Sequence, residues 1–393
     1  MEIKFANRLL QVKPSPTLAV SEKAGQLKRE GRNIISLGTG EPDFDTPVNI
    51  KNAAIAAIDN GFTKYTAVDG IIELKEAIQN KFNRDNQIQY DLNQILVSSG
   101  GKQSCFNLCL ALLNEGDEVL IPAPYWVSYP DMVKLAYGTP VIINTTPQMD
   151  YKITSELLEK SITKKTKLIF LNSPSNPSGV AYTHDELAKI GQVLLKHPQI
   201  IIASDDMYEH ILWSYEFANI LNACPELYSR TVLLNGVSKA YSMTGWRIGY
   251  AAGPADLIKA MKKIQSQSTS NPCSISQKAA VEALNGNQDS VQKMIKSFKS
   301  RHDYVCSRLQ NMPGIDVVPA NGTFYIFPSV AEIIKNKGFK NDIEFAENLL
   351  QEEGLAIVPG SAFGIEDCIR ISFAVSQDTL VDAMNRLERF IKK

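Results

Sequence analysis

The stretch "TVLLNGVSKAYSMTGWRIGYAA", residues 231–252, begins and ends with short apolar runs and places two charged side chains between them. Residues 231–234 and 248–252 have the length and composition of buried strands. Lys239 and Arg247 fall in the connection. Charged side chains are seldom buried without a partner, so the pair indicates either a ligand or counter-ion, or a solvated loop. The remainder of the chain has to distinguish these explanations.

Five more apolar runs of the same kind precede this stretch, at residues 95–97, 118–121, 141–143, 168–171 and 200–203. Helix-like stretches such as "KQSCFNLCLALLNEG" and "HDELAKIGQVLLKH" lie between many of them. Buried strands that alternate with helices predict an α/β domain with a mostly parallel sheet, here of seven strands.

The chain of 393 residues exceeds the size at which a single core keeps growing, so more than one domain is expected. We expect a large domain at residues 48–285. Beyond residue 285, long charged amphipathic helices with few strands between them predict a smaller α+β domain at 286–393. Residues 1–47 lack the parallel-strand pattern and are expected to pack on the small domain or on a partner subunit.

Composition excludes several classes of protein. With 41 Lys+Arg against 42 Asp+Glu and no long basic run, neither nucleic acid nor a membrane surface is an expected partner. The six cysteines form no CxxC pair and no zinc-like cluster, which indicates reduced thiols and no metal site. The sequence has no signal-like stretch and no apolar run of membrane-spanning length, so a soluble cytoplasmic protein is expected.

Polar and aromatic residues follow the strands at their carboxyl ends, where open α/β sheets bind ligands. Gly100 and Gly101 precede a helix, an arrangement that suits a phosphate but is also common in ordinary turns. Trp126 follows the next strand and either faces a planar ring or anchors its loop. Asn176, in "NSPSNPSG", either donates an amide hydrogen bond or belongs to a plain turn.

Asp205 and Tyr208 follow the strand at 200–203, and a carboxylate at that place in a hydrophobic sheet needs a cationic partner or strong donors. With the stretch at 231–252, five strand ends carry such residues. One ligand accounts for all of them if it carries a phosphate, a planar ring, a protonated ring nitrogen and an aldehyde. That ligand is pyridoxal 5′-phosphate, and the groups that would meet it are Gly100, Gly101, Ser238 and Arg247 for the phosphate, Trp126 for the ring, Asp205 for the nitrogen and Lys239 for the aldehyde.

Taken together, these motifs resemble the class I aminotransferases of pyridoxal-phosphate fold type I, most closely the bacterial aspartate and prephenate aminotransferase branch. The resemblance extends over nearly the whole chain. Its motifs are "KPSPT", "GEPDFDTP", "TKYTAVDG", "GGKQ", "PYWVSYP", "NPSG", "SDDMYEH", "SKAYSMTGWRIGY" and "CIRISFA". Two positions depart from the family pattern: Asp206 stands where glutamate is usual and Ser178 where threonine is usual.

The resemblance implies a role for each cofactor-site residue. Lys239 would bind the cofactor's aldehyde and move the substrate proton, and Asp205 would keep the ring nitrogen protonated. Asn176 and Tyr208 would hydrogen-bond the ring hydroxyl. Lys102 and Trp126 would border both cofactor and substrate. Tyr65 would reach the phosphate of a neighbouring subunit, which implies a homodimer with composite sites.

The resemblance also implies how an amino acid is bound. Arg370 would hold the α-carboxylate in a bidentate fork, beside the backbone of Gly38. Lys102 would meet the side-chain carboxylate of a dicarboxylic substrate; the alternative is a solvated lysine at a helix start. Ser15 and Thr17 would assist Lys102, and Lys13 matches a position that some relatives use for prephenate.

The implied reaction is a ping-pong exchange between L-aspartate and 2-oxoglutarate, giving oxaloacetate and L-glutamate, with prephenate as a further substrate. The alternatives within the same fold are an aromatic or alanine-type aminotransferase and a C–S lyase. A nicotinamide oxidoreductase is disfavoured, because "GTGEPD" at residues 38–43 lacks the third glycine of the fingerprint. A non-catalytic regulator is disfavoured because the chain has no additional DNA-binding domain.

Overall fold

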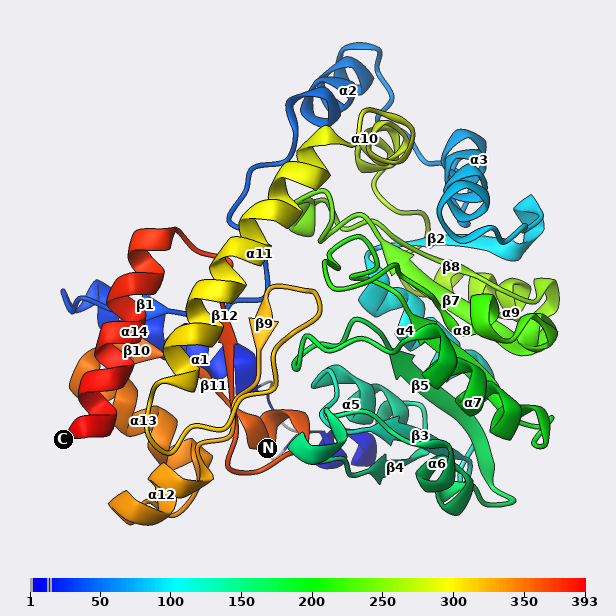
Figure 1. The fold of residues 1–393 in the computed structure, drawn as a ribbon. Helices are drawn as coiled ribbons and strands as arrows, with labels where there is room; N and C mark the ends of the chain where they lie inside the picture. Colours follow the sequence, from blue (N-terminus) through cyan, green and yellow to red (C-terminus); the bar gives the residue numbers. More distant parts are fainter. Residues whose placement is uncertain (1–2, 13, 15) are drawn as a thin grey trace.

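The computed structural model describes residues 3–12, 14 and 16–393, and a seven-stranded sheet is its central element (Figure 1). The strand order is β2-β8-β7-β6-β5-β3-β4, and only β8 runs antiparallel to its neighbours. Each of the seven apolar runs identified in the sequence is one of these strands, so the predicted sheet is confirmed. The strands are β2 (Ile95–Ser98), β3 (Glu118–Pro122), β4 (Thr139–Ile143), β5 (Thr166–Asn172), β6 (Ile201–Asp205), β7 (Thr231–Gly236) and β8 (Gly249–Ala252).

Successive residues of the central strands point into two different apolar cores, one on each face of the sheet. In β5, for example, Leu168 and Phe170 enter one core while Ile169 and Leu171 enter the other. This alternation explains why the strands are apolar throughout: both faces are covered by helices. One face is covered by α4 (Gly101–Leu112), α5 (Ser128–Leu135) and α9 (Ala255–Ser266), and the other by α3 (Ile72–Lys81), α6 (Ser155–Ser161), α7 (His184–Leu195), α8 (Ile220–Ala223) and α10 (Ser274–Asn285).

The C-terminal part of the chain forms a separate layer with its own apolar core, built around residues such as Phe298, Phe345 and Leu387. A small antiparallel sheet of order β11-β12-β9 lies within it. Its elements are α11 (Asp289–Gln310), β9 (Tyr325–Ile326), α12 (Ala331–Lys337), α13 (Asp342–Glu353), β10 (Leu355–Ala356), β11 (Val358–Pro359), β12 (Ile369–Ser372) and α14 (Gln377–Lys392).

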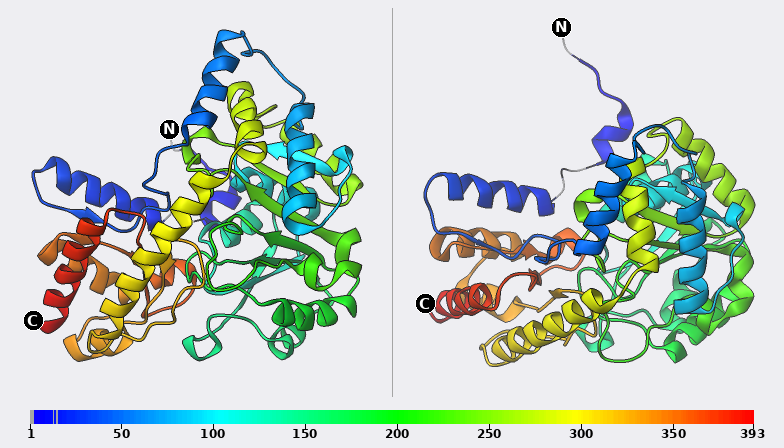
Figure 2. Two further views of the ribbon diagram at one scale, coloured as in Figure 1. Left: turned by 45° about the horizontal axis from the view of Figure 1, so that its top comes forward. Right: turned by 90° about the horizontal axis from the view of Figure 1, so that it is seen from above.

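The N-terminal segment packs largely against this C-terminal layer. After α1 (Pro16–Arg29), β1 (Ile35–Ser36) pairs in parallel with β10, and Figure 2 shows α1 alongside the C-terminal elements. The helix α2 (Val48–Asp59) instead packs on α10. The long helix α11 joins the two parts, because Val291 belongs to a core of the seven-stranded sheet and Phe298 to the C-terminal core. The domain boundaries at residues 47 and 285 stay a prediction.

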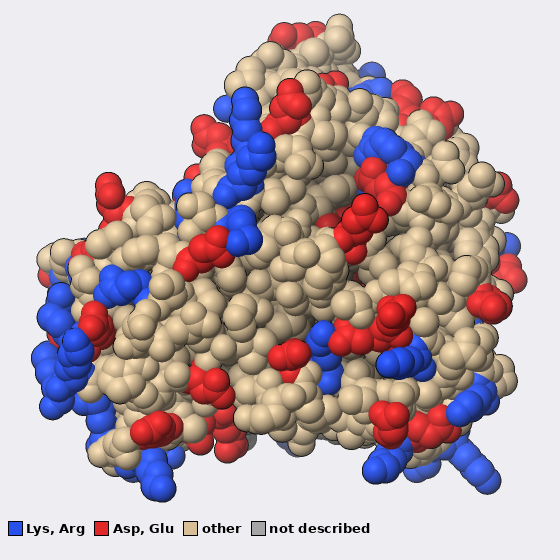
Figure 3. Space-filling model, viewed as in Figure 1, with Lys and Arg blue, Asp and Glu red and all other residues tan. Residues whose placement is uncertain are grey.

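The surface carries charges of both signs, and on the face shown in Figure 3 basic and acidic side chains are interspersed. Within the described ranges, no helix combines the length and apolar character that a bilayer crossing requires. No group of three or more histidine, cysteine or acidic side chains in that part of the chain is placed to hold a metal ion. The six cysteines are free thiols, and Cys273 alone among them is exposed.

Candidate functional site

A cavity of about 310 Å³ lies at the carboxyl edge of the large sheet, where it meets β9 and β12 of the C-terminal layer. Because β8 is antiparallel, the residues before it lie at the same edge as the residues that follow β5, β6 and β7. The cavity gathers most of the residues singled out from the sequence. Those that line it are Gly38, Gly101, Lys102, Trp126, Asn176, Asp205, Tyr208, Ser238, Lys239, Arg247 and Arg370.

Lys239 places a partly buried amine at this cavity. Its Nζ donates a hydrogen bond to the carbonyl oxygen of Gly40 at 2.5 Å. Burial, together with the positive charge of Arg370, lowers the pKa of Lys239 to about 8. At neutral pH roughly one molecule in ten therefore carries the uncharged, nucleophilic amine, against fewer than one in a thousand for an unperturbed lysine.

Asp205 ends β6 and is only 7% exposed. The hydroxyl of Tyr129 donates a hydrogen bond to Oδ2, and the backbone N–H of Met207 donates to Oδ1 at 3.3 Å. Burial raises the pKa of Asp205, while the hydrogen bond from Tyr129 acts in the opposite direction. The ring of Tyr129 is itself held by stacking on Phe170, with 4.4 Å between the ring centroids. A carboxylate has about four acceptor positions, so Asp205 can accept a further hydrogen bond from a ligand.

Arg370 lies on the opposite wall, on β12, and is 3% exposed. Its two terminal nitrogens donate to Asn176 Oδ1 at 2.9 Å and to the carbonyl oxygen of Gly38 at 2.7 Å. Its buried Nε has no hydrogen-bond partner among the described residues. A buried guanidinium needs a compensating anion, and both of its described acceptors are neutral amide oxygens. The side chain is therefore suited to a carboxylate ligand, which can accept a bidentate pair of hydrogen bonds.

Tyr208 approaches Arg370 through a second tyrosine. The hydroxyl groups of Tyr208 and Tyr325 are 3.2 Å apart, and the Arg370 guanidinium lies 4.4 Å from the centroid of the Tyr325 ring. Burial raises the pKa of Tyr208 well above its usual value. Tyr208 therefore stays protonated at neutral pH and can donate a hydrogen bond into the cavity.

The N-terminus of α4 forms an anion cradle at the other end of the cavity. Gly100 adopts a φ of 92°, and a Cβ there would lie 2.1 Å from a terminal nitrogen of Arg247. Only glycine therefore lets the guanidinium lie against this helix start. Arg247 donates to the carbonyl oxygen of Thr244 at 2.8 Å, and Ser238 donates from Oγ to Met207 Sδ at 3.3 Å. A helix N-terminus, a hydroxyl and a guanidinium together suit a phosphate.

Lys102 and Trp126 lie beside each other at the cavity wall, with the ammonium 5.1 Å from the indole ring. Burial and the neighbouring Arg247 lower the pKa of Lys102. Lys102 is nevertheless exposed at the cavity wall, so its recognition of a ligand carboxylate stays a prediction.

Some predicted site residues lie away from the cavity. Gly100 does not line it, although its neighbour Gly101 does. Tyr65 is 92% exposed and makes no part of the lining. Lys13 and Ser15 lie outside the described residues, and for Thr17 the structure describes only the backbone, within α1.

Other residues line the cavity, or in the case of Tyr129 hydrogen-bond a lining residue, although the sequence analysis did not single them out. Tyr129 lies four residues before another buried position of the same helix, so its spacing in the sequence indicates core packing alone. Tyr325 comes from a two-residue strand of the C-terminal layer, where no strand-end rule applies. Asn172 is the last residue of β5 and the first residue of "NSPSNPSG", a stretch in which the sequence analysis singled out Asn176 alone. Met207 and Cys105 also line the cavity, and neither carried a distinguishing pattern.

Comparison with known proteins agrees with this geometry. A family model described as "Aminotransferase class I and II" matches residues 32–387. An aspartate/prephenate aminotransferase of Nitrosomonas europaea is 55% identical, covering 98% of this chain and 99% of the relative. One of Cereibacter sphaeroides is 52% identical, with 98% of each chain covered.

Solved structures are equally similar. The aspartate aminotransferase of Rhizobium meliloti superposes with a TM-score of 0.96 at 46% identity, covering 100% of this chain and 99% of the other. That of Thermus thermophilus, solved with maleate, superposes with a TM-score of 0.94 at 38% identity, covering 99% and 100%. The chain therefore belongs to the class I and II aminotransferase family.

Proposed function

We propose that this protein transfers the amino group of L-aspartate to 2-oxoglutarate in a ping-pong reaction, and that it also uses prephenate. The observation that carries the proposal is the pairing, in one cavity, of a partly buried amine of lowered pKa with a buried arginine that has no anionic partner among the described residues. The names of the relatives support aspartate and prephenate as substrates. The test is a panel of amino donors and 2-oxo acids. Formation of glutamate and oxaloacetate supports the proposal, whereas release of ammonia and a thiol would indicate a lyase.

We propose pyridoxal 5′-phosphate as the cofactor, and the donor set of the cavity fits it. The phosphate would be held by Gly101, Ser238 and Arg247 and by the cradle at Gly100, which a Cβ would fill. Asp205 would bind the ring nitrogen, and Trp126 would lie against the ring. Asn176 and Tyr208 would hydrogen-bond the ring hydroxyl. When bound, the cofactor supplies an aldehyde and an electron-accepting ring.

The residues of the chain then have distinct tasks. Arg370 binds the substrate α-carboxylate and, with the backbone of Gly38, orients the Cα–H bond toward Lys239. The neutral amine of Lys239 removes the proton from Cα in the first half-reaction and returns one to Cα in the second. Asp205 keeps a proton on the ring nitrogen throughout.

Lys102 is proposed to recognise the side-chain carboxylate of aspartate, with Ser15 and Thr17, while Lys13 serves prephenate. Lys102→Ala is therefore expected to lower kcat/KM for aspartate by about 10- to 100-fold, the cost of losing one charge-assisted hydrogen bond. Alanine, which has no side-chain carboxylate, is the matched control substrate and should be used at an unchanged rate. An unchanged ratio of the two kcat/KM values would show that the dicarboxylate is recognised elsewhere.

The pKa of Lys239 predicts how cofactor uptake depends on pH. Only the deprotonated amine attacks an aldehyde, and its folded-state pKa of about 8 lies below the ordinary lysine value. The rate at which cofactor-free protein binds pyridoxal phosphate should therefore rise through a midpoint near pH 8 and level off above it. Stopped-flow absorbance measures this rate. A midpoint near the ordinary lysine pKa would contradict the assigned environment of Lys239.

We also propose a homodimer in which Tyr65 of each subunit reaches the phosphate bound by the other. Tyr65 is 92% exposed in the single chain and has no role within it, which supports a contact with a partner. Mass measurement in solution tests this proposal, with twice the chain mass of 43.5 kDa expected. A cytoplasmic location stays a prediction.

A further inference from the structure

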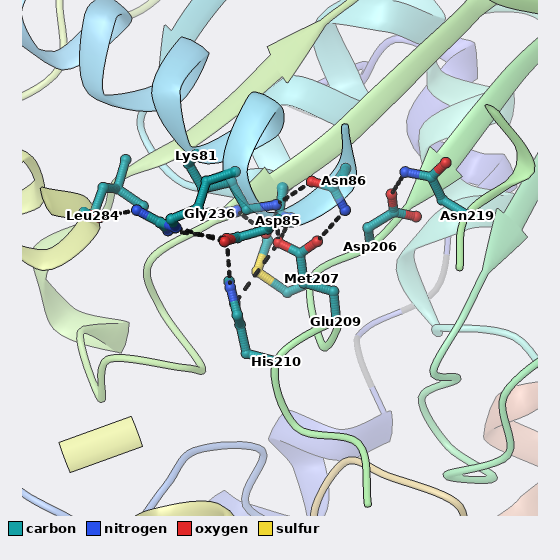
Figure 4. A network of polar contacts seen from close by, with 12 residues as sticks. Lys81, Asp85, Asn86, Asp206, Met207, Glu209, His210, Asn219, Gly236 and Leu284 are labelled. Atoms are coloured by element: carbon teal, nitrogen blue, oxygen red, sulfur yellow. Dashed lines mark hydrogen bonds and ion pairs between the residues drawn. The ribbon is translucent and has the colours of Figure 1, made fainter. Parts of the chain in front are cut away.

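The segment that carries Asp205 and Tyr208 has two differently occupied faces. Asp205, Met207 and Tyr208 line the cavity. Asp206, Glu209 and His210 point the other way, into a polar network beneath the sheet edge (Figure 4). The mechanism above uses the first face and assigns nothing to the second.

Glu209 is the centre of this network, and partners from three elements hold both of its carboxylate oxygens. Lys81, the last residue of α3, forms an ion pair with Oε1, and its side chain is 0% exposed. Asn235 on β7 donates to Oε1 at 2.7 Å, and Asn86 donates to Oε2 at 3.0 Å. Lys81 also donates to Asn86 Oδ1 at 2.7 Å, which closes the ring of contacts.

Asp206 and His210 of the same segment also have polar partners. Asp206 accepts hydrogen bonds from Ser204 Oγ at 2.7 Å and from Asn219 Nδ2 at 3.2 Å. The Nε2 atom of His210 lies 3.1 Å from Asp85 Oδ2. In the chain, Tyr208 therefore lies between Asp206 and Glu209, whose side chains are both held by polar partners. Asp205 directly precedes Asp206.

Stability alone does not account for a buried ion pair at this place. Removing two charges from water is costly, and well-packed apolar residues usually stabilise a fold at least as well. Burial acts to raise the pKa of Glu209, but the charge of Lys81 lowers it below its usual value. The glutamate therefore stays ionised. An ion pair with fixed hydrogen-bond partners adds a defined geometry of the side chains. Apolar packing defines that geometry less strictly.

We infer that Glu209, held by Lys81, is a positioning residue that fixes Tyr208 and Asp205 against the cofactor ring without touching it. The inference rests on the proposed function. It predicts that loosening Glu209 slows the reaction and changes the environment of the bound cofactor, while the substrate grip of Arg370 on β12 stays intact.

Glu209→Gln, in the holoenzyme, tests the inference. The substitution keeps the shape of the side chain. It replaces one carboxylate oxygen, which accepts hydrogen bonds from the asparagines or the lysine, with an amide nitrogen that cannot accept them. A misplacement of about 1 Å costs up to about 100-fold, so kcat should fall about 10- to 100-fold. KM for aspartate should change little, since its carboxylates are bound elsewhere. The pH at which the visible absorption of the bound cofactor changes should move by about one unit, a readout that is independent of turnover.

Lys75→Met is the matched control. Lys75 lies on the same helix and forms a largely buried ion pair with Asp69 at 2.9 Å, but Asp69 has a second partner in Lys262 and no contact with the segment 205–210 among the described residues. This variant should keep the wild-type kcat and absorption midpoint even where its melting temperature falls. Equal changes in Lys75→Met and Glu209→Gln would overturn the inference.

In Glu209→Gln, the buried charge of Lys81 loses its partner. The double variant Lys81→Met/Glu209→Gln also removes that charge, and it provides the test if the single variant does not fold. Continued loss of kcat with a shifted midpoint supports positioning. Recovery of both wild-type values would show that the ion pair is merely structural and overturns the inference. A wild-type protein that binds no pyridoxal phosphate or fails to transaminate would instead refute the proposed function, so the two failures are distinguishable.

Discussion

Lys239→Ala is expected to lower kcat for aspartate and 2-oxoglutarate by at least about 10⁴-fold. The substitution removes both the amine that holds the cofactor and the base that moves the Cα proton, and a positioned acid–base group alone contributes up to about that factor. No other lysine is placed to replace it among the described cavity-lining residues, because Lys102 lies against Trp126. Coupled detection of oxaloacetate measures the loss.

A small primary amine added to Lys239→Ala should restore part of the lost rate, because the cavity left by the side chain can admit it. Lys196→Ala, at a surface lysine paired with Glu159, is the control and should behave as the wild type. A Lys239→Ala protein that turns over normally without added amine would refute the assignment.

Asp205→Asn is expected to lower kcat by about 100- to 1,000-fold, the usual cost of removing one preorganised electrostatic contact from an active site. Asparagine has nearly the same shape and can still accept the hydrogen bond from Tyr129. Without the negative charge, however, a proton on the ring nitrogen is no longer stabilised, and the ring accepts electrons less well. KM for aspartate should change less than kcat, since Arg370 is untouched.

The environment of Asp205 provides two controls for this experiment. Tyr129→Phe keeps the carboxylate and removes one donor, so its loss of kcat should be smaller than that of Asp205→Asn. Asp185→Asn, at a surface aspartate, should have no effect on kcat. If Asp205→Asn kept wild-type kcat, the proposed partner of the ring nitrogen would have to be another group.

The seven strands of the large sheet were predictable because each is a short apolar run bounded by turn residues, with a helix pattern between most of them. The strand β1 of the N-terminal segment and the strands β9, β10 and β11 of the C-terminal layer were not, because each is only two residues long. Periodicity needs a longer segment than that. The packing of β1 on β10 depends on contacts between the two ends of the chain, which no local pattern contains.

The candidate site divides in a similar way. Asp205 and Lys239 were predictable from the rule that ligands bind at the carboxyl ends of parallel strands. Arg370 lies on an antiparallel strand outside that rule, and the resemblance to a known family was needed to identify it. Glu209 and Lys81 were missed because each follows an ordinary helix or loop pattern, in which a charged residue indicates a solvated face. Their pairing exists only in the folded chain.

Reduction of the holoenzyme with borohydride, followed by digestion and mass spectrometry, tests the central claim most directly. The claim is that Lys239 holds pyridoxal 5′-phosphate through its side-chain amine. It predicts that the reduced cofactor is found on the peptide containing Lys239, and that prior removal of the cofactor abolishes the label. Recovery of the cofactor on another lysine, or on no peptide at all, would contradict the account.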